Sequence, residues 1–493
     1  MNCSRSGRCG RGCWVGWLCV LVFGDARAAD PVGATRFEFT ADPDWDGYRN
    51  RLLGDRLRET RQDFGYRTSQ HAGGAHAGEV GGFVQRSTTP AYYALPIPPR
   101  DADQTLVASG KLAVTAAEGG SGALVGWFHD QSSRGWRTPN SVAMRIDGNG
   151  GSFWLFFEYG TRDWQTGGGG AFAGDRYQTT PTPPFRADGA AHDWRLEYDP
   201  HAASGRGMLR LSIDDREYEY ELPEGHRQAG FELNRFGIWN QHSSGDGLEL
   251  YLDDLTVDGQ RLEFDQDPAW DTLGNQAKFL DRVRRPLHDF GHSRSQHAGA
   301  QLGEIGGIFF RDEQPAYYAA RRRVSTLDTP LRAAGKIAML QGGADSGVYL
   351  GWFDSASKRA KTDADYDTPQ RNYLGAAIEG PSRVGHYFRS VYATREGASG
   401  GAPLDGDAAA LPSIIRPDGR AHDWALQYDP RAAEGRGALS VVFDGREHRV
   451  ELTAEQRRQG AVFDRFGVFT IQAGGNHLEL YLDDLEIMDA GAE

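Results

Sequence analysis

A short segment early in the chain gathers polar residues that can perform acid–base chemistry. It contains Gln70, His71, Glu79, Arg86 and the pair Tyr92-Tyr93. A histidine and a carboxylate within reach of each other can exchange protons with a substrate or hydrogen-bond to hydroxyl groups. The glycines around Glu79 would let a sugar ring or another backbone approach closely. Glu79 and His71 are therefore catalytic candidates, and the other side chains are substrate-binding candidates.

The same cluster occurs again 225 or 226 residues later, with different residues between the shared positions. The second copy contains Gln296, His297, Glu304, Arg311 and the pair Tyr317-Tyr318. His297 and Glu304 are catalytic candidates in turn, and Gln296, Arg311 and Tyr318 are substrate-binding candidates. A structural interpretation carries equal weight. Each glutamate could pair with its arginine or accept backbone N–H groups in a bulge, while each histidine caps a turn.

One strand differs between the two copies. Strand alternation places Trp154, Phe156 and Glu158 on one face. The second copy has Arg389 and Val391 at the positions of Phe156 and Glu158. A carboxylate beside aromatic rings is typical of a sugar site, because the rings stack on CH faces. Glu158 is therefore a further catalytic candidate and Trp154 and Arg389 are binding candidates; the alternative is an amphipathic strand with one solvated acid.

The residues around this strand supply the remaining substrate-binding candidates. They are Asn140, Arg145, Trp164 and Asn372. Arg145 becomes Ala377 in the second copy, so the difference extends beyond the strand itself. Divergent clefts favour one working site, or a site built between domains, over two equal binding sites.

The elements that must position these residues are β-strands. Runs such as Met208 to Ile213 and Leu248 to Leu252 alternate apolar and polar residues, and Gly, Pro and Asp-Gly separate the runs. Many short strands in a unit of about 225 residues indicate a two-sheet sandwich. We place the two domains at residues 34–260 and 261–489. Two charged stretches, Gly47 to Gln62 and Thr272 to Asp289, are expected to be short helices or long loops.

The first 28 residues have the features of a secretory signal peptide. Three arginines precede the short apolar run Trp14 to Phe23, and Ala26 to Ala28 forms a small-x-small cleavage site. All four cysteines lie in this segment, so the mature chain would have no disulfide or catalytic thiol. Removing its four Arg and Asp25 takes the formal charge from −14 to −17. We expect a periplasmic or extracellular protein that binds neither nucleic acid nor membrane.

A family resemblance rests on the last third of each copy. His192-Asp193-Trp194 with the later strand Leu248 to Leu255 returns as His422-Asp423-Trp424 with Leu478 to Leu485. This pattern resembles the concanavalin A-like lectin/glucanase superfamily. The resemblance implies an all-β fold of two tandem jelly-roll β-sandwich domains. Lectins, glycoside hydrolases, polysaccharide lyases and binding modules share this fold, so it does not select among these functions.

The resemblance also implies a structural metal. An aspartate at the end of the last strand in this superfamily often holds Ca²⁺ together with backbone carbonyls, and Asp253 and Asp483 occupy that place. The alternative is a solvated acid in a turn. Zinc is not expected, because neither copy has a cysteine or a close His-x-x-x-His pair. No cofactor is expected for chemistry.

These observations together favour a secreted enzyme that cleaves a polysaccharide or oligosaccharide. Glycoside hydrolysis is favoured, although the Glu-x-Asp-x-x-Glu signature of jelly-roll glucanases is absent. A polysaccharide lyase of the same fold would instead use Gln, Arg, His and Tyr side chains. A tandem glycan-binding protein without catalysis would gain affinity from two linked sites. An interaction or scaffold module is the fourth alternative.

Overall fold

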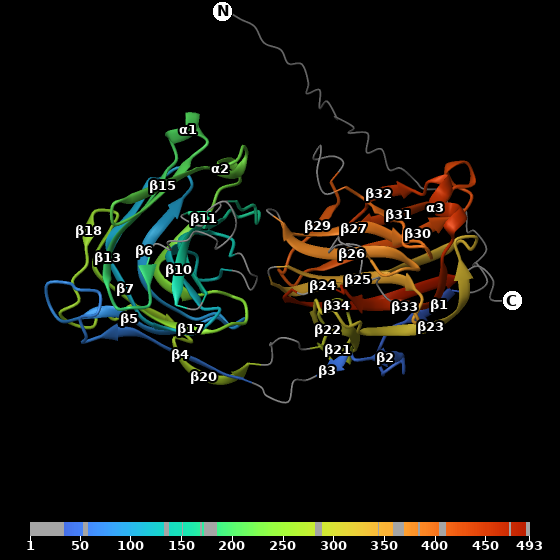
Figure 1. The fold of residues 1–493 in the computed structure, drawn as a ribbon, viewed down its shortest axis with the longest axis horizontal. Helices are drawn as coiled ribbons and strands as arrows, with labels where there is room; N and C mark the ends of the chain where they lie inside the picture. The colour runs from blue at the N-terminus through green and yellow to red at the C-terminus, as the bar shows by residue number, and fades with distance from the viewer. Residues whose placement is uncertain are drawn as a thin grey trace, which may run out of the picture.

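The short alternating segments form antiparallel strands in the computed structural model. It describes residues 34–52, 58–132, 138–149, 151–167, 170–171, 185–281, 288–343, 345–357, 369–382, 385–403, 411–472 and 475–489. The strands build four sheets, and two sheets face each other in each of two bodies that lie side by side (Figure 1). We call these bodies sandwich 1 and sandwich 2. The predicted all-β jelly-roll fold is confirmed, and the two bodies agree with the predicted pair of domains.

Sandwich 1 has a nine-stranded and an eight-stranded sheet. The first, here called the β7 sheet, has the order β15 (Arg216–Glu221), β14 (Met208–Ile213), β13 (Ala191–Asp199), β7 (Leu106–Ala117), β17 (Gly247–Val257), β5 (Glu79–Gln85), β4 (Arg58–Arg67) and β20 (Gln276–Asp281), with β18 (Gln260–Arg261) on β17. The second, here called the β8 sheet, has the order β11 (Gly170–Ala171), β10 (Ser152–Gly160), β9 (Ser141–Asn149), β8 (Gly122–Phe128), β16 (Glu232–Asn240), β6 (Tyr92–Asp101) and β19 (Asp271–Leu273), with β12 (Phe185–Arg186) on β10.

Sandwich 2 repeats this order strand for strand. Its β24 sheet contains β3 (Arg51–Leu52), β21 (His288–Ser293), β22 (Glu304–Phe310), β34 (His477–Asp489), β24 (Leu331–Gly342), β30 (Ala421–Asp429), β31 (Ala438–Phe443) and β32 (Arg446–Glu451), with β1 (Ala34–Phe37) on β34. Its β25 sheet contains β2 (Asp46–Tyr48), β23 (Tyr317–Thr326), β33 (Val462–Thr470), β25 (Ser346–Phe353), β26 (Tyr373–Ser382), β27 (Gly385–Ala393) and β28 (Ser399–Gly401), with β29 (Ser413–Ile415) on β27.

The described helices are single short turns between strands. They are α1 (Ala202–Gly205), α2 (His226–Ala229), the 3₁₀ turn η1 (Ala433–Gly435) and α3 (Ala454–Gln459). No helix within the described ranges has the length and apolar character that a membrane crossing requires. The predicted signal peptide, residues 1–28, lies outside the described residues.

Each sandwich encloses its own apolar core between its two sheets. Trp127 of the Gly-Trp-Phe motif is fully buried and meets Phe236 edge-on, with 5.2 Å between ring centroids. Trp352 and Phe466 repeat this contact in sandwich 2 at 4.9 Å. The glycine before each tryptophan is needed for strand spacing, because a Cβ on Gly126 would lie 2.4 Å from a backbone oxygen of the next strand. The shared motif is therefore part of the core frame.

Each sandwich is completed by strands from the other repeat. β1, β2 and β3, blue in Figure 1, pair with β34, β23 and β21 among the yellow to red strands of sandwich 2. Conversely, β19 and β20 pair with β6 and β4 of sandwich 1. The leading segments of the two repeats, residues 34–52 and 260–281, are therefore exchanged reciprocally.

Equivalent polar contacts hold both exchanged segments. Asn275 donates to the Phe64 carbonyl at 2.6 Å, and its own carbonyl accepts from the Phe64 N–H at 3.0 Å. Asn50 makes the same two contacts with Phe290, at 2.6 and 3.0 Å. A reciprocal pair of this kind satisfies backbone groups that a strand edge would otherwise leave open. Each exchanged segment is therefore held in its acceptor sandwich by the same specific hydrogen bonds.

Two sequence expectations differ from this arrangement. The boundary at residues 260–261 marks the repeat in the sequence, whereas the sheets place residues 260–281 with the strands that precede them. The charged stretches 47–62 and 272–289 are expected from the sequence to be helices or loops, and that prediction is wrong for their described residues, which leave out 53–57 and 282–287. They contain β2 to β4 and β19 to β21, because pairing with a distant strand outweighs their weak local preference.

Candidate functional site

Glu79 begins β5 with a fully buried carboxylate. Its two oxygens accept backbone hydrogen bonds from the N–H groups of His71 and Ala72, both at 2.8 Å. Glu304 pins the equivalent loop of sandwich 2 with bonds between 2.8 and 3.0 Å. Such charge-assisted bonds are strong and fix the loop conformation. These contacts favour the structural alternative over catalysis for both glutamates.

The neighbouring side chains of this loop are also engaged in holding it. The His71 ring packs on Tyr251, with 4.4 Å between ring centroids, and Gln70 donates to the carbonyl four residues later at 2.5 Å. His297 and Gln296 make the equivalent contacts in sandwich 2 at 4.6 and 2.6 Å. The loop therefore covers the outer face of the β7 sheet, and its sandwich 2 counterpart covers the β24 sheet.

The two regions expected to meet in one cleft lie on different sheets. Glu79 belongs to the β7 sheet, and Glu158 belongs to the β8 sheet. Arg86, which follows β5, reaches toward the β8 sheet: its Nη2 donates to Ser243 Oγ at 2.8 Å, and its Nη1 lies 3.9 Å from an oxygen of Asp147 on β9. Arg311 follows β22 at the equivalent place in sandwich 2 and is partly buried.

The tyrosine pair divides between the two faces of its sheet. Tyr93 points into the core, where its hydroxyl donates to Asp267 of the exchanged segment at 3.0 Å. Tyr318 does the same with Asp42 at 2.8 Å. Burial raises the pKa of both phenols well above the usual value. These two tyrosines fasten the exchanged segments, while Tyr92 points to the outer face.

The predicted asparagines lie in turns. Asn140 has a φ of 53°, and its side-chain oxygen accepts from the Glu232 N–H at 3.0 Å. Asn372 has a φ of 56° and accepts from Val462 N–H at 3.1 Å. Asparagine tolerates this left-handed conformation better than most residues. Both join neighbouring strands, and Trp164 lies partly buried in the loop after β10.

Asp253 is buried beneath the loop that Glu79 holds. It is 6 % exposed; one carboxylate oxygen accepts from the Asp254 N–H at 2.7 Å, and Oδ2 has no hydrogen-bond partner among the described residues. Burial raises its pKa to about 6, and the nearby charges of Asp254 and Glu79 add to the shift. Asp483 is the counterpart in sandwich 2, where burial again raises the pKa to about 6.

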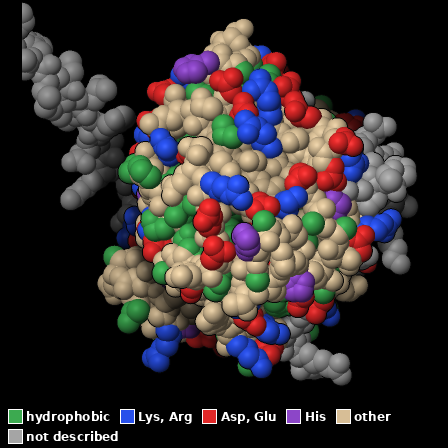
Figure 2. Space-filling model, turned by 90° about the vertical axis from the view of Figure 1, so that its left-hand side faces the viewer, with side chains coloured by type: hydrophobic (Ala, Val, Ile, Leu, Met, Phe, Trp, Pro, Cys, Tyr) green, Lys and Arg blue, Asp and Glu red, His purple; other side chains and the backbone are tan. Residues whose placement is uncertain are grey.

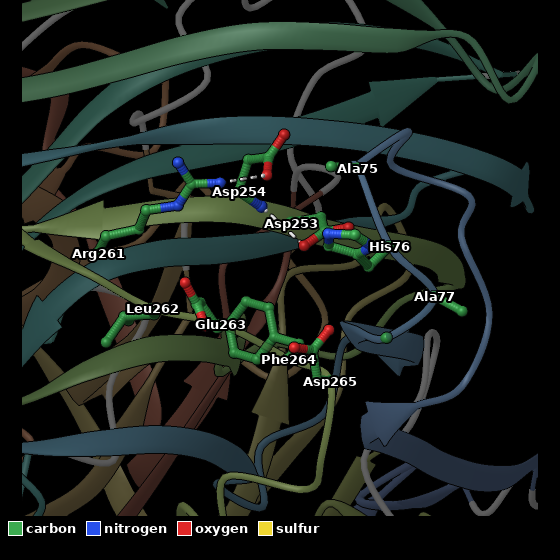
Figure 3. Close-up of a pocket in the computed structure, with 11 residues that line it drawn as sticks. Ala75, His76, Ala77, Asp253, Asp254, Arg261, Leu262, Glu263, Phe264 and Asp265 are labelled. Carbon is green, nitrogen blue, oxygen red and sulfur yellow. Dashed lines mark hydrogen bonds and ion pairs between the residues drawn. The ribbon is translucent and has the colours of Figure 1, made fainter.

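A pocket opens beside Asp253 (Figure 3). It is lined by residues 75–78, by Asp253 and Asp254, and by residues 261–265 of the exchanged segment. Arg261 reaches back to Asp254, with 3.6 Å between Nη2 and Oδ1. Over the described ranges, no three acidic, histidine or cysteine side chains are grouped as a metal would need. A cation here would therefore depend on backbone carbonyls as well as on Asp253.

The outer surface around this pocket carries charges of both signs. Figure 2 shows acidic and basic side chains interspersed over this side of the molecule, with small hydrophobic areas between them. A surface of this kind shows no large field of one sign that would attract a polyelectrolyte.

A different group of charges lies on the outer face of the β8 sheet. Arg145 of β9 contacts two carboxylates: its Nη1 is 2.5 Å from Asp147 and its Nε is 3.2 Å from Glu158 of β10. Its guanidinium also lies over the ring of Phe156, 4.3 Å from the centroid. All of these side chains are at most 7 % exposed. Neighbouring strands thus bring one cation, two acids and a ring together.

Next to this group lie buried polar atoms that have no partner among the described residues. Both amide atoms of Gln241 are unpaired although the residue is only 2 % exposed. The Gln241 amide lies against Gly122 of β8. Gly122 pairs with Asp147 on the neighbouring strand β9. The indole N–H groups of Trp154 and Trp239 are likewise buried and unpaired. The face therefore has unused donors and an acceptor beside its charged group.

Aromatic rings continue this face toward β6. Phe128 lies 4.5 Å from Trp239 and 5.3 Å from Tyr92, measured between ring centroids. Together with the rings of Trp154 and Phe156, they frame the polar group with apolar surface. Aromatic rings beside carboxylates and an amide are the composition that a sugar requires.

The same face of sandwich 2 is apolar at these positions. Ile471 and Phe469 occupy the positions of Gln241 and Trp239. Phe469 packs against Tyr349, Phe353 and Tyr373, with ring centroids between 4.8 and 5.1 Å apart. These rings form one buried cluster that covers the middle of the β25 sheet.

One ion pair remains on this face of sandwich 2. Arg389 pairs with Glu379, which occupies the register position of Asp147. Tyr387 replaces Trp154, and Val391 replaces Glu158. At these positions sandwich 2 therefore has valine, isoleucine, tyrosine and phenylalanine side chains in place of the second carboxylate, the amide and the two indoles of sandwich 1.

The structure brings together some of the predicted residues. Arg145, Trp154 and Glu158 meet on one face, as strand alternation predicted, and Arg86 reaches its edge. The prediction omitted three further members of this face, Asp147, Gln241 and Trp239. Asp147 could have been found from its two-residue spacing to Arg145. Gln241 could have been found by comparing the two copies, because the equivalent residue of the second copy is the apolar Ile471.

Comparisons with known proteins match the arrangement loosely. No protein-family model and no curated protein matches this chain. Among solved structures, the mouse laminin alpha1 chain domains LG4-5 match with 12 % identity and a TM-score of 0.25, over 83 % of this chain and 89 % of that one. The alginate lyase Aly36B matches with 11 % identity and a TM-score of 0.27, over 42 % and 88 %. The Emp47p carbohydrate recognition domain matches with 14 % identity and a TM-score of 0.26, over 42 % and 91 %. The fold assignment rests on the strand order and register of this chain itself.

Proposed function

We propose that sandwich 1 binds a glycan on the outer face of its β8 sheet. The supporting observation is the buried amide of Gln241, which has no partner among the described residues and lies against Gly122, the register neighbour of Asp147. A buried amide without partners costs about 1–3 kcal/mol, and sugar hydroxyls can satisfy both its donor and its acceptor. The buried rings of Trp154 and Trp239 lie on the same face and would contact the CH faces of a sugar bound there.

A matched pair of variants tests this proposal. Gln241→Ile introduces the residue that sandwich 2 has, and Gln427→Ile makes the same change at an exposed position of β30. We expect Gln241→Ile to weaken glycan binding at least about tenfold in calorimetry, because each 1.4 kcal/mol is a factor of ten. Gln427→Ile should bind like the unaltered protein. If all three proteins bind every polysaccharide of a panel with equal affinity, glycan binding on the outer face of the β8 sheet is contradicted.

Hydrolysis of the bound glycan is the second candidate function, favoured by the carboxylate pair. Glycoside hydrolases need two carboxyl groups, one as acid and the other as base or nucleophile. Asp147 and Glu158 are held by the same guanidinium, that of Arg145, and lie on neighbouring strands. In this proposal they replace Glu79 as the reacting pair.

The reaction is tested by what the protein releases from a polysaccharide. Hydrolysis produces new reducing ends without the absorbance of an unsaturated uronate, whereas elimination by a lyase produces that absorbance. Glu158→Gln and Asp147→Asn should each lower the hydrolytic rate by a factor of 100 or more, in line with loss of a catalytic acid or base of about 10²–10⁴. A protein that binds but releases no product would be a glycan-binding protein only.

We also propose that Asp253 and Asp483 help to hold a structural Ca²⁺. The buried carboxylate of Asp253, which lies against Gly74 at the edge of this pocket, suits a hard cation that takes oxygen ligands. Calcium should raise the unfolding temperature of the protein, and a chelator should lower it. Asp253→Asn should reduce that response, whereas Asp215→Asn in an exposed turn should not.

We further propose that the chain is secreted and acts on a polysaccharide or oligosaccharide outside the cytoplasm. The support is the segment 1–28, with its basic start, apolar run and cleavage motif. Amino-terminal sequencing of protein from the periplasm or the medium tests this. A mature protein that still begins at Met1 would contradict it.

A further inference from the structure

An arginine stands at the same place in both sandwiches, at the end of the outer face. Strand β12 of sandwich 1 consists of Phe185 and Arg186, and the equivalent residues of sandwich 2 are Ile415 and Arg416. Phe185 and Ile415 belong to the two apolar cores. Because successive side chains of a strand point to opposite sides, the two arginines point to the outer faces of the β8 and β25 sheets.

Neither of these guanidinium groups contacts a carboxylate among the described residues. Arg186 is exposed, and its Nη1 donates to Ser152 Oγ at 3.1 Å. Arg416 is partly buried beside Gly385, and its Nε has no hydrogen-bond partner in the described part of the chain. Arginine keeps its proton in proteins, so both groups carry a positive charge that a ligand can use.

Other arginines on the same two faces differ in this respect. Arg145 of sandwich 1 contacts Asp147 and Glu158, and Arg389 of sandwich 2 pairs with Glu379. Their guanidinium groups are engaged with acids of the protein itself. Arg186 and Arg416 make no such contact within the described ranges, although the two sandwiches differ at most other polar positions of these faces.

Arg186 lies close to the surface proposed for the sugar. Its register neighbour is Ser152, and Trp154 lies two residues further along β10 on the same face. Neighbouring strands are about 4.8 Å apart and two residues span about 7 Å, a separation that the long arginine side chain can cross. Tyr387 has the place of Trp154 near Arg416. Each face therefore combines a ring with a nearby cation.

We infer that the glycan of sandwich 1 carries acidic groups, carboxylate or sulfate, and that Arg186 binds one of them. Arg416 provides the equivalent anion-binding group in sandwich 2. This inference rests on the proposed glycan binding and deepens it by naming the class of glycan. The chemical reason is that a guanidinium donates parallel, charge-assisted hydrogen bonds to the oxygens of an anion.

Matched polymers with the complete protein test this class in calorimetry. Polygalacturonate and its methyl ester differ in the charge of the carboxyl group, and dextran sulfate and dextran differ in the sulfate group. Alginate and hyaluronate add further carboxylates, and β-glucan and xylan add further neutral chains. We expect at least one acidic probe to bind at least about tenfold more tightly than the neutral probes. The matched pair that shows the difference distinguishes carboxylate from sulfate.

A matched pair of variants tests the role of Arg186. Arg186→Gln should weaken binding of the acidic probe at least about tenfold, because a charge-assisted contact is lost. Arg195→Gln, which removes an exposed arginine paired with Glu197 on the opposite sheet, should bind like the unaltered protein. Arg186→Lys should retain part of the affinity, because the charge remains. The affinity ratio between the unaltered protein and Arg186→Gln should fall toward one as salt increases.

Thermal unfolding separates this role from a structural one. Arg186→Gln should unfold at the same temperature as the unaltered protein, because the described contact of Arg186 is a single hydrogen bond to an exposed edge. In sandwich 2, Arg416→Gln should weaken the acidic probe further when combined with Arg186→Gln. The control is Arg449→Gln, at an exposed arginine paired with Glu451. A double variant that binds as Arg186→Gln does would overturn the inference for Arg416.

The outcomes distinguish this inference from the proposed function. A neutral probe that Gln241→Ile weakens and Arg186→Gln does not would overturn the acidic class and leave glycan binding at this face in place. Binding of no polymer at all would overturn both, as would binding that neither variant changes. Binding of an acidic probe that both variants weaken supports both.

Discussion

The outer faces of the β8 and β25 sheets have the same strands in the same register but different chemistry. Sandwich 1 has two carboxylates paired with Arg145 there, together with an amide and two indole N–H groups that have no partner among the described residues. Sandwich 2 has a closed cluster of rings with one ion pair. Unpaired buried polar groups are costly, whereas packed rings stabilise a sheet. The difference is what a functional face and a structural face of one fold would show.

The largest expected loss of stability comes from replacing a core tryptophan of an exchanged segment, and it tests which sandwich each segment belongs to. Trp45 lies in the core of sandwich 2, and Trp270 lies in the core of sandwich 1, although each belongs to the other repeat. Replacing either by Ala should cost about 3–5 kcal/mol. Hydrogen exchange should show lost protection in residues 288–489 for Trp45→Ala and in residues 58–260 for Trp270→Ala. The opposite assignment would rule out the strand exchange.

Acid should destabilise sandwich 2 before sandwich 1. Burial lowers the pKa of His288 to about 4 and that of His386 to about 3. The unfolded chain takes up these protons near pH 6.5, so this stability is complete above pH 6.5 and is lost progressively as pH falls toward 4 and 3. At about 1.4 kcal/mol for each pKa unit, the loss should be on the order of 3 kcal/mol for His288 and about 5 kcal/mol for His386.

The matched variant for this test uses residues of sandwich 1. Gln62 and Phe153 occupy the positions of His288 and His386. The double variant His288→Gln with His386→Phe should flatten the pH dependence of unfolding between pH 7 and 4. An unchanged dependence would mean that other groups control the acid response.

The loop glutamates should affect stability and leave binding intact. Glu79→Gln and Glu304→Gln each weaken two backbone contacts of a buried carboxylate, at a cost of about 1–3 kcal/mol. Chemical denaturation measures the cost, and calorimetry measures glycan binding. A Glu79→Gln protein with normal stability but no activity would return Glu79 to the catalytic residues.

The smallest expected effect has opposite signs in the two sandwiches. Gln241→Ile removes an unpaired buried amide and should stabilise the ligand-free protein by about 1 kcal/mol. Ile471→Gln introduces such an amide among rings and should destabilise by a similar amount or more. Thermal unfolding of both variants measures this. Destabilisation by Gln241→Ile would indicate that the amide has a structural partner.

Several features were predictable from local patterns. Alternation predicted that Trp154 and Glu158 share a face, and the repeat predicted two equivalent sandwiches. The contact of Arg145 with Glu158 was not predictable, because it depends on the register between β9 and β10, whereas Asp147 lies two residues from Arg145 on the same strand. The role of Glu79 was also open, because a carboxylate among glycines can face a ligand or accept backbone N–H groups.

The sequence by itself determined the β class, the duplication and the place where the two copies differ. These properties follow from residue periodicity and from comparing one copy with the other. Tertiary structure alone decided that residues 34–52 and 260–281 exchange partners. Their local chemistry is equivalent, as the same contacts of Asn50 and Asn275 show, so either acceptor satisfies them. Tertiary structure also decided that the cluster around Glu79, which both copies share, lies apart from the strand of Glu158, which differs between them. The two lie on opposite sheets, and only the folding of the chain sets the distance between them.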